Sequence, residues 1–184
     1  MAGAGRYGEL MHAWFERIAW SEQGIPGREA LLAEPCAAGM DPALVERAME
    51  QFRKAMGHAE IAAVLSRERA EAMEPGSEVE VRAELPFLMR SRATTHGAMI
   101  AGRMDRVTIG WKDGAAKWVE IVDFKTDARD AANPEWIGER MEAHRAQMEA
   151  YRSAASEMFG VPMARVGIWL VFTSVPAAAR VEPA

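Results

Sequence analysis

Apolar residues in the first part of the chain recur at the spacing of helices. Between residues 7 and 18 they fall at i, i+3, i+4, i+7 and i+11, which predicts an amphipathic helix with one buried face. Asp41 as N-cap and Pro42 at the first helical position mark another helix start, and Pro75 with Gly76 ends the helical part. Beyond the first helix, this pattern predicts three more helical segments: residues 28–38, 42–56 and 58–73.

The hydrophobic period then changes to that of strands. Val79, Val81, Leu85 and Phe87 alternate with charged residues, as expected for a strand with one buried face. The Asp113–Gly114 pair between two apolar runs predicts a hairpin turn. The pattern predicts strands in five segments: residues 78–90, 97–109, 117–125, 164–175 and a short one within 177–183.

One long helix is predicted between the third and fourth strands. Asn133 and Pro134 cap its start, and Gly160 stops it after Phe159. Helices, a three-stranded meander, a long helix and a returning strand together predict an α/β sandwich with a mixed sheet. We expect residues 1–184 to form a single domain, with a helical N-terminal part (residues 1–75) and an α/β core (residues 76–184).

Composition narrows the class of protein. The 184 residues are 49% hydrophobic and 27% charged, as in an ordinary globular domain. Cys36 is the one cysteine, which excludes a disulfide framework and a cysteine-ligated iron–sulfur cluster and favours a cytoplasmic location. No apolar run approaches the roughly 20 residues that span a bilayer. The net charge of −5 argues against a surface that binds nucleic acid everywhere, but it leaves room for a local basic groove.

Candidate chemistry lies at the end of the third strand, in the sequence VEIVDFKTD. Asp123 and Lys125 are two residues apart, so their side chains leave the same face, and a hairpin closed at Asp113–Gly114 brings Asp105 close to Asp123. Two carboxylates and a lysine suit metal-assisted hydrolysis of a phosphodiester. D-x-K is a weak motif, however, and an Asp105–Lys125 ion pair at a sheet edge would explain the same residues.

Further polar residues fall near this point. Gln147 and Tyr151 are at i and i+4 on one face of the long helix. Tyr151 belongs to its predicted buried stripe and Gln147 lies beside it; the stripe is Ile137, Met141, His144, Met148, Tyr151 and Ala155. His12 flanks the apolar stripe of the first helix, and Glu84 lies on the polar face of the first strand. Each of these residues also has an ordinary structural interpretation: Gln147 as an exposed residue, Tyr151 as a half-buried one, His12 as a surface histidine and Glu84 as a solvated glutamate.

Several arginines flank the same region on the first two strands. They could contact phosphates, although a solvated strand face is the more ordinary interpretation. These arginines are Arg90, Arg92, Arg103 and Arg106.

Five segments together resemble a known family. GELMHAWFE, AELPF, GRMDRV, IVDFKT and QMEAY occur in the order and spacing of the RecB-type nuclease domains, over about residues 6–182. Those domains belong to the PD-(D/E)XK superfamily and form the ends of the AddA and RecB helicase–nucleases. The resemblance implies a restriction-endonuclease-like core, a mixed sheet flanked by helices, and Mg²⁺-dependent DNA cleavage in which Mn²⁺ can substitute.

The resemblance also implies roles for individual residues. His12, Asp105 and Asp123 match the metal-binding positions, and Lys125 matches the catalytic lysine. Gln147 and Tyr151 match residues of the helix that lines the site and meets DNA. Glu84 matches an acidic position before the first core strand.

Relatives of the AddB type carry four cysteines for an iron–sulfur cluster, which this chain lacks. A Walker A motif is also absent, so a helicase motor would have to be a separate domain or subunit. We therefore expect a nuclease domain of an AddA/RecB-like helicase–nuclease that processes double-strand breaks. The alternatives are a standalone RecB-like exonuclease and a catalytically inactive module that binds DNA or a helicase.

Overall fold

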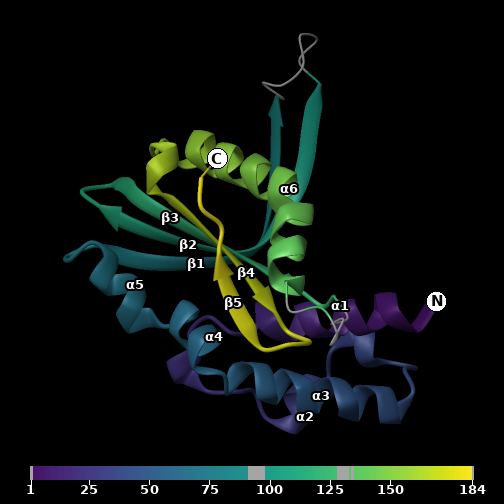
Figure 1. Cartoon of the computed structure of the whole chain (residues 1–184). Coiled ribbons are helices and arrows are strands. Elements are labelled where there is room, and N and C mark those ends of the chain that lie inside the picture. Colours follow the sequence, from purple (N-terminus) through teal and green to yellow (C-terminus); the bar gives the residue numbers. More distant parts are fainter. Residues whose placement is uncertain (1, 91–97, 128–132, 134, 184) are drawn as a thin grey trace.

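A computed structural model of the chain describes residues 2–90, 98–127, 133 and 135–183. Its centre is a five-stranded sheet in the order β1-β2-β3-β4-β5, with helices on both faces (Figure 1). The α/β fold with a mixed sheet, predicted from the sequence, is confirmed. Among the described helices, none is long and apolar enough to cross a membrane.

The N-terminal part is helical, as predicted, but two helices are shorter than expected. The segment 28–38 divides into a helix and a 3-10 turn, because Pro35 has no N–H to continue a helix. The segment 58–73 divides at Ser66, whose hydroxyl accepts the N–H of Arg69 and caps a new helix. Asp41 is an N-cap, as predicted, and accepts the N–H of Ala43. The helices are α1 Ala2–Glu16, α2 Arg28–Leu32, α3 Pro42–Met56, α4 Ala59–Val64 and α5 Arg67–Met73.

The sheet combines a meander with a crossover. Its strands are β1 Glu78–Arg90, β2 Met99–Lys112, β3 Ala115–Lys125, β4 Val166–Phe172 and β5 Ala177–Arg180. Neighbouring strands are antiparallel except β3 and β4, which run parallel. Asp113 and Gly114 both have positive φ and form the predicted β2–β3 turn.

The crossover between β3 and β4 is the long helix α6, Trp136–Phe159. Asn133 accepts the N–H of Glu135 just before it, whereas Pro134 lies outside the described residues. Gly160 ends the helix in the left-handed conformation, as predicted.

Strand β3 is buried on both faces, which fixes the position of its polar end. Val122 and Phe124 pack against α1, α3 and the other N-terminal helices, and Phe124 stacks on Phe15 with ring centroids 4.3 Å apart. Val119 and Ile121 face the opposite way, into the core beneath α6. The N-terminal helices and α6 therefore pack on opposite faces of β3, the strand that carries Asp123 and Lys125.

Arg106 does not lie on a solvated strand face, so that part of the sequence interpretation is wrong. Its side chain is 2% exposed, donates to Thr108 Oγ1 and Ala19 O, and lies over the Trp20 ring. Burial lowers the pKa of this guanidinium to about 10. Arg106 thus joins the sheet to the N-terminal helices instead of facing a ligand.

The contact between β2 and Trp118 gives a test of the packing. A Cβ at Gly110 would lie 2.1 Å from Trp118 Nε1, and Trp118 is 1% exposed. We expect Gly110→Ala to lower the free energy of unfolding by about 1 to 3 kcal/mol, measured by denaturant titration. Gly138→Ala on α6 is the control, because nothing lies within 4 Å of its Cβ, and it should be neutral or stabilising. Equal stability of the two variants would contradict the packing.

Candidate active site

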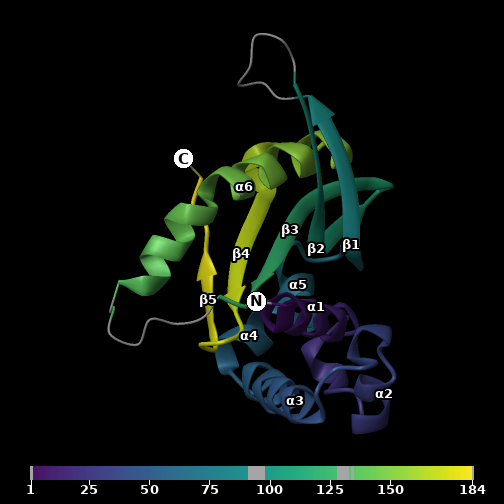
Figure 2. The same cartoon turned by 90° about the vertical axis from the view of Figure 1, so that its right-hand side faces the viewer.

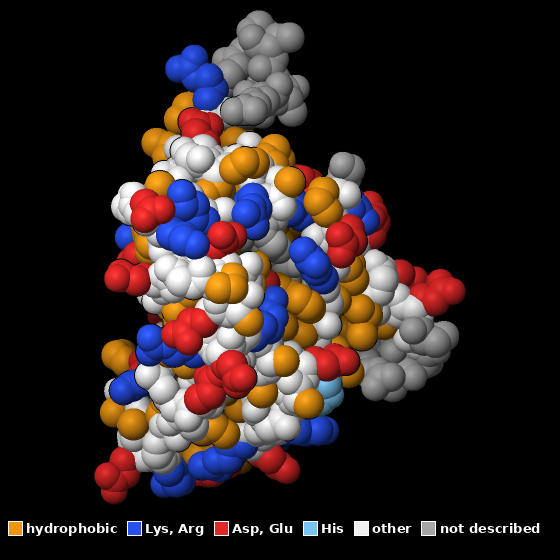
Figure 3. Space-filling model, turned by 90° about the vertical axis from the view of Figure 1, so that its left-hand side faces the viewer, with side chains coloured by type: hydrophobic (Ala, Val, Ile, Leu, Met, Phe, Trp, Pro, Cys, Tyr) orange, Lys and Arg blue, Asp and Glu red, His pale blue; other side chains and the backbone are white. Residues whose placement is uncertain are grey.

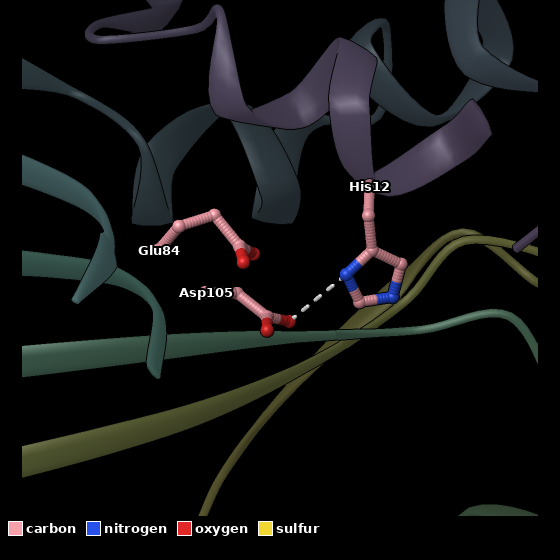
Figure 4. A group of neighbouring side chains, drawn as sticks. All are labelled: His12, Glu84 and Asp105. Atoms are coloured by element: carbon pink, nitrogen blue, oxygen red, sulfur yellow. Dashed lines mark ion pairs between the residues drawn. The ribbon is translucent and has the colours of Figure 1, made fainter. Parts of the chain in front are cut away.

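Three side chains from three elements converge beside the end of the sheet. His12 comes from α1, Glu84 from β1 and Asp105 from β2, and they point toward one another (Figure 4). One ligand atom of each lies within 4.8 Å of the others. His12 Nδ1 is 3.4 Å from Asp105 Oδ2, and that oxygen also accepts the N–H of Phe124 at 2.8 Å. The cluster therefore contains two carboxylates and an imidazole, a set of groups able to hold a divalent ion.

Glu84 reaches this cluster through an unusual backbone conformation. Its φ is +50°, which is uncommon for a residue with a side chain. The flanking residues Ala83 and Leu85 pair normally with β2, so Glu84 lies opposite Asp105. Such a conformation costs about 1 to 3 kcal/mol and persists only where the surroundings enforce it. Its occurrence opposite Asp105 supports a functional role for Glu84.

A second group of side chains extends from β3 to α6. Lys125 Nζ lies 2.7 Å from Asp123 Oδ2 and donates to Gln147 Oε1 at 3.1 Å. Gln147 Nε2 donates to Tyr151 OH at 2.7 Å, and that hydroxyl donates to Arg103 O at 2.8 Å. The lysine thus pairs with Asp123, not with Asp105 as the alternative interpretation required. Gln147 is exposed, yet its amide oxygen and its amide nitrogen both form hydrogen bonds with residues of the site.

The electrostatics favour a cation at the cluster. Burial and the Asp123 carboxylate raise the pKa of Asp105 well above the ordinary aspartate value. Burial lowers the pKa of His12, so the imidazole is favoured in its neutral, ligand form. Asp123 itself is 2% exposed. Carboxylates held together away from water bind either protons or a metal ion, and hard oxygen donors suit Mg²⁺ or Mn²⁺.

Two clefts meet at this point. One of about 740 Å³ is lined by α1 residues together with Glu84, Arg103 and Asp105. The other, of about 460 Å³, is lined by Asp123, Lys125 and the polar face of α6. His12 and Asp105 line both. A bound strand could therefore reach the carboxylates from either side.

Two residues of the second cleft were not found from the sequence. His144 was placed in the buried stripe of α6, but it is half-buried, lines the cleft, and has Nε2 3.6 Å from Asp127 Oδ2. Of the other residues of that stripe, Met148, Tyr151 and Ala155 are buried, as predicted, whereas Ile137 and Met141 are partly buried. The signal was present, because His144 is three residues before Gln147 on the same helical face and Asp127 is two after Lys125.

Comparison with protein families agrees with this geometry. The family model of the PD-(D/E)XK nuclease superfamily matches residues 2–183, nearly the whole chain. The protein therefore belongs to the PD-(D/E)XK nuclease superfamily, and its mixed sheet flanked by helices fits the core of that class. Nucleases of this superfamily use divalent metals, and the His12, Glu84 and Asp105 cluster fits such an ion. No curated protein matches the sequence significantly.

The raised pKa of Asp105 predicts a stability cost in the metal-free protein. A carboxyl whose folded pKa lies above its unfolded value stabilises the fold at low pH, and that stability is lost as pH rises through the folded pKa. At neutral pH with EDTA, we expect Asp105→Asn to raise the Tm by about 2 to 4 °C, equivalent to about 1 kcal/mol. The gain should shrink as the pH is lowered.

The matched control is Asp41→Asn at the N-cap of α3, since aspartate and asparagine cap a helix about equally well. It should leave the Tm nearly unchanged at every pH. If Asp105→Asn lowers the Tm in EDTA at neutral pH, the ionised Asp105 carboxylate does not destabilise the metal-free protein.

Proposed function

We propose that this protein is a Mg²⁺-dependent deoxyribonuclease that hydrolyses phosphodiester bonds, with Mn²⁺ as an effective substitute. One observation carries the proposal: Asp105 and Asp123 meet the Lys125–Gln147–Tyr151 chain where two clefts join. A purely structural ion pair would not need polar groups from α1, β1, β2, β3 and α6 at one point. The family supports the nuclease class.

His12, Asp105 and Asp123 are the proposed metal ligands. His12 and Asp105 are already within 3.4 Å of each other, and the Asp123 carboxylate contributes to the raised pKa of Asp105. Glu84 would adjoin an ion bound there, since its carboxylate belongs to the cluster with His12 and Asp105. When bound, a divalent ion supplies Lewis acidity and lowers the pKa of a coordinated water.

The remaining residues position the reacting groups. The Lys125 ammonium, held between Asp123 and Gln147, orients the attacking water and stabilises negative charge that develops on the phosphate. Gln147 and Tyr151 orient the DNA strand from α6, and the bond from Tyr151 OH to Arg103 O fixes that helix face relative to β2. The reaction is hydrolytic and forms no covalent enzyme intermediate.

For the biological setting, we propose a nuclease domain of the AddA/RecB type that acts as an exonuclease on DNA ends in the cytoplasm. A helicase domain or subunit would deliver the strand during repair of double-strand breaks by recombination. The five segments that resemble RecB-type domains support this setting, and the single Cys36 is consistent with a site without an iron–sulfur cluster. A standalone RecB-like exonuclease would use the same site without a motor.

We further propose that residues 1–184 act as one nuclease domain. The helical part (residues 1–75) supplies His12, and the α/β core (residues 76–184) supplies the carboxylates and the lysine. A core without α1 would therefore lack one wall of the cluster.

The first test is DNA cleavage. With Mg²⁺ or Mn²⁺, the purified protein should degrade linear DNA, and Lys125→Ala or Asp123→Ala should reduce the rate at least about 100-fold, because each removes charge next to the reacting phosphate. Lys112→Ala is the control, because Lys112 ends β2, donates to Pro75 O and lines neither of the two clefts. Intact DNA with wild-type protein, or full activity in Lys125→Ala, would refute the catalytic assignment.

The second test separates a nuclease from an inactive binding module. Calorimetric titration with Mn²⁺ should show binding that Asp105→Asn and Asp123→Asn each weaken at least about 10-fold, because they remove a charged ligand. Glu84→Gln should weaken binding as well, since its carboxylate lies in the cluster. Glu46→Gln is the control, because this glutamate is exposed on the outer side of α3. A protein that binds no metal but still binds DNA would be the inactive module.

A further inference from the structure

The β1–β2 hairpin has one face that nothing in the described structure covers. Residues opposite each other in an antiparallel pair lie on the same face, and so do residues two apart along a strand. We define the outer hairpin face by three such pairs, Pro86 with Arg103, Leu88 with Ala101, and Arg90 with Met99. All six residues are exposed.

The opposite face of the same hairpin is covered. Phe87 and Met89 are buried, and Phe87 packs edge-on against Tyr151 of α6 with ring centroids 5.6 Å apart. In both ribbon views the hairpin extends past α6 and away from the N-terminal helices (Figures 1 and 2). The hairpin is therefore anchored on one side and open on the other.

The outer hairpin face has an unusual composition. It combines two arginines with four apolar residues and no acid, in a chain of net charge −5. Leu88 is 68% exposed and Met99 is 56% exposed, the two highest values among the exposed large apolar side chains of the described residues. Elsewhere charges are mixed: on the side of the β2–β3 turn and α5, acidic and basic side chains are interspersed (Figure 3). A surface with this pairing of cations and apolar groups suits a ligand with both phosphates and flat apolar parts.

This face leads directly into the candidate active site. Beyond Pro86 and Arg103, Glu84 and Asp105 lie at the position where the ladder is interrupted, and Arg103 forms an ion pair with Glu84. At about 3.4 Å per residue, Arg103 lies about 7 Å and Met99 about 20 Å from Asp105 along β2. That length corresponds to several nucleotides of an extended strand. Across the adjoining cleft, Glu9 and Glu16 of α1 present negative charge, which would hold a phosphate backbone on the arginine side.

We propose that the outer hairpin face binds an unpaired stretch of DNA strand on its way to the carboxylates, an inference that rests on the proposed nuclease function. Arg90 and Arg103 contact phosphates, while Leu88 and Met99 contact the faces of bases. Apolar side chains can reach base faces only where the bases are unstacked, as in a single strand or a frayed end. The structure thus assigns single-stranded DNA as the preferred substrate of this site.

The experiment measures binding of a fluorescent 20-nucleotide oligothymidine by anisotropy, in EDTA so that no cleavage occurs. We expect Leu88→Ser/Met99→Ser and, separately, Arg90→Ala to weaken binding by about 5- to 10-fold each. Arg90→Ala should also reduce the slope of log affinity against log salt by about 0.7, the value for one phosphate contact on a single strand. Binding of a blunt duplex of the same length should be weaker and insensitive to Leu88→Ser/Met99→Ser.

Matched controls remove the same chemistry elsewhere. Met73→Ser removes an exposed methionine from α5, and Arg82→Ala removes an exposed arginine from β1 that pairs with Glu80. Both should bind the oligonucleotide as wild type does. Because the substituted residues are exposed, every variant should keep the wild-type Tm within about 2 °C.

The outcomes distinguish this inference from the nuclease proposal. If wild-type protein cleaves DNA but the hairpin variants bind the oligonucleotide as tightly as the controls, the hairpin assignment is overturned and the nuclease proposal stands. If the hairpin variants lose affinity while wild-type protein cleaves nothing, the binding face is supported and the nuclease proposal fails. If Leu88→Ser/Met99→Ser converts an oligomer into a monomer in sedimentation without changing DNA affinity, the face joins copies of the chain and the inference is overturned.

Discussion

Carboxylates held together away from solvent are the constraint on which the rest of this structure depends. Asp105 on β2 and Asp123 on β3 lie on neighbouring strands, and Glu84 lies opposite Asp105. Asp123 is buried and the other two are partly buried, so water screens their charges less than it would at the surface. Neighbouring groups offset the repulsion between these carboxylates only in part: Lys125 pairs with Asp123 and Arg103 with Glu84, whereas Asp105 has a backbone N–H and the imidazole of His12. This arrangement destabilises the metal-free protein and favours the binding of a divalent cation. Such a trade of stability for binding is expected of a site selected for function.

Two separate cores hold these groups in place against their repulsion. The N-terminal helices pack beneath Val122 and Phe124 and bring His12 to Asp105, while α6 packs above Ile121 and brings Gln147 and Tyr151 to Lys125. Because β3 is buried between them, its polar end cannot move toward solvent to relax the site. Buried polar contacts reinforce the same junction, with Glu120 bound by Arg69 and by the indole N–H of Trp169. The site is thus a product of the whole domain and not of one hairpin.

Much of this could be anticipated from the sequence, because it depends on local patterns. Alternation predicted the strands, the Asp113–Gly114 turn set the hairpin, and the i, i+4 spacing put Gln147 and Tyr151 on one face. What was missed depends on tertiary contacts. The left-handed backbone at Glu84 and the burial of Arg106 over Trp20 have no local sequence signal. The contact of His144 with Asp127 had only the helical spacing to Gln147 as a signal, too weak to compete with a packed interpretation. The two divided helices were missed because helical periodicity continues through Pro35 and Ser66, whose backbone preferences decide the outcome.

Anomalous diffraction from crystals soaked in Mn²⁺ tests the central claim most directly, because it locates the ion without relying on activity. The account predicts an anomalous peak at coordination distance, about 2.0 to 2.3 Å, from an oxygen of Asp105, with His12 and at least one of Glu84 and Asp123 completing the protein ligands. A peak elsewhere, or none at Mn²⁺ concentrations that saturate related sites, would contradict the claim that these carboxylates are held together to bind a metal ion.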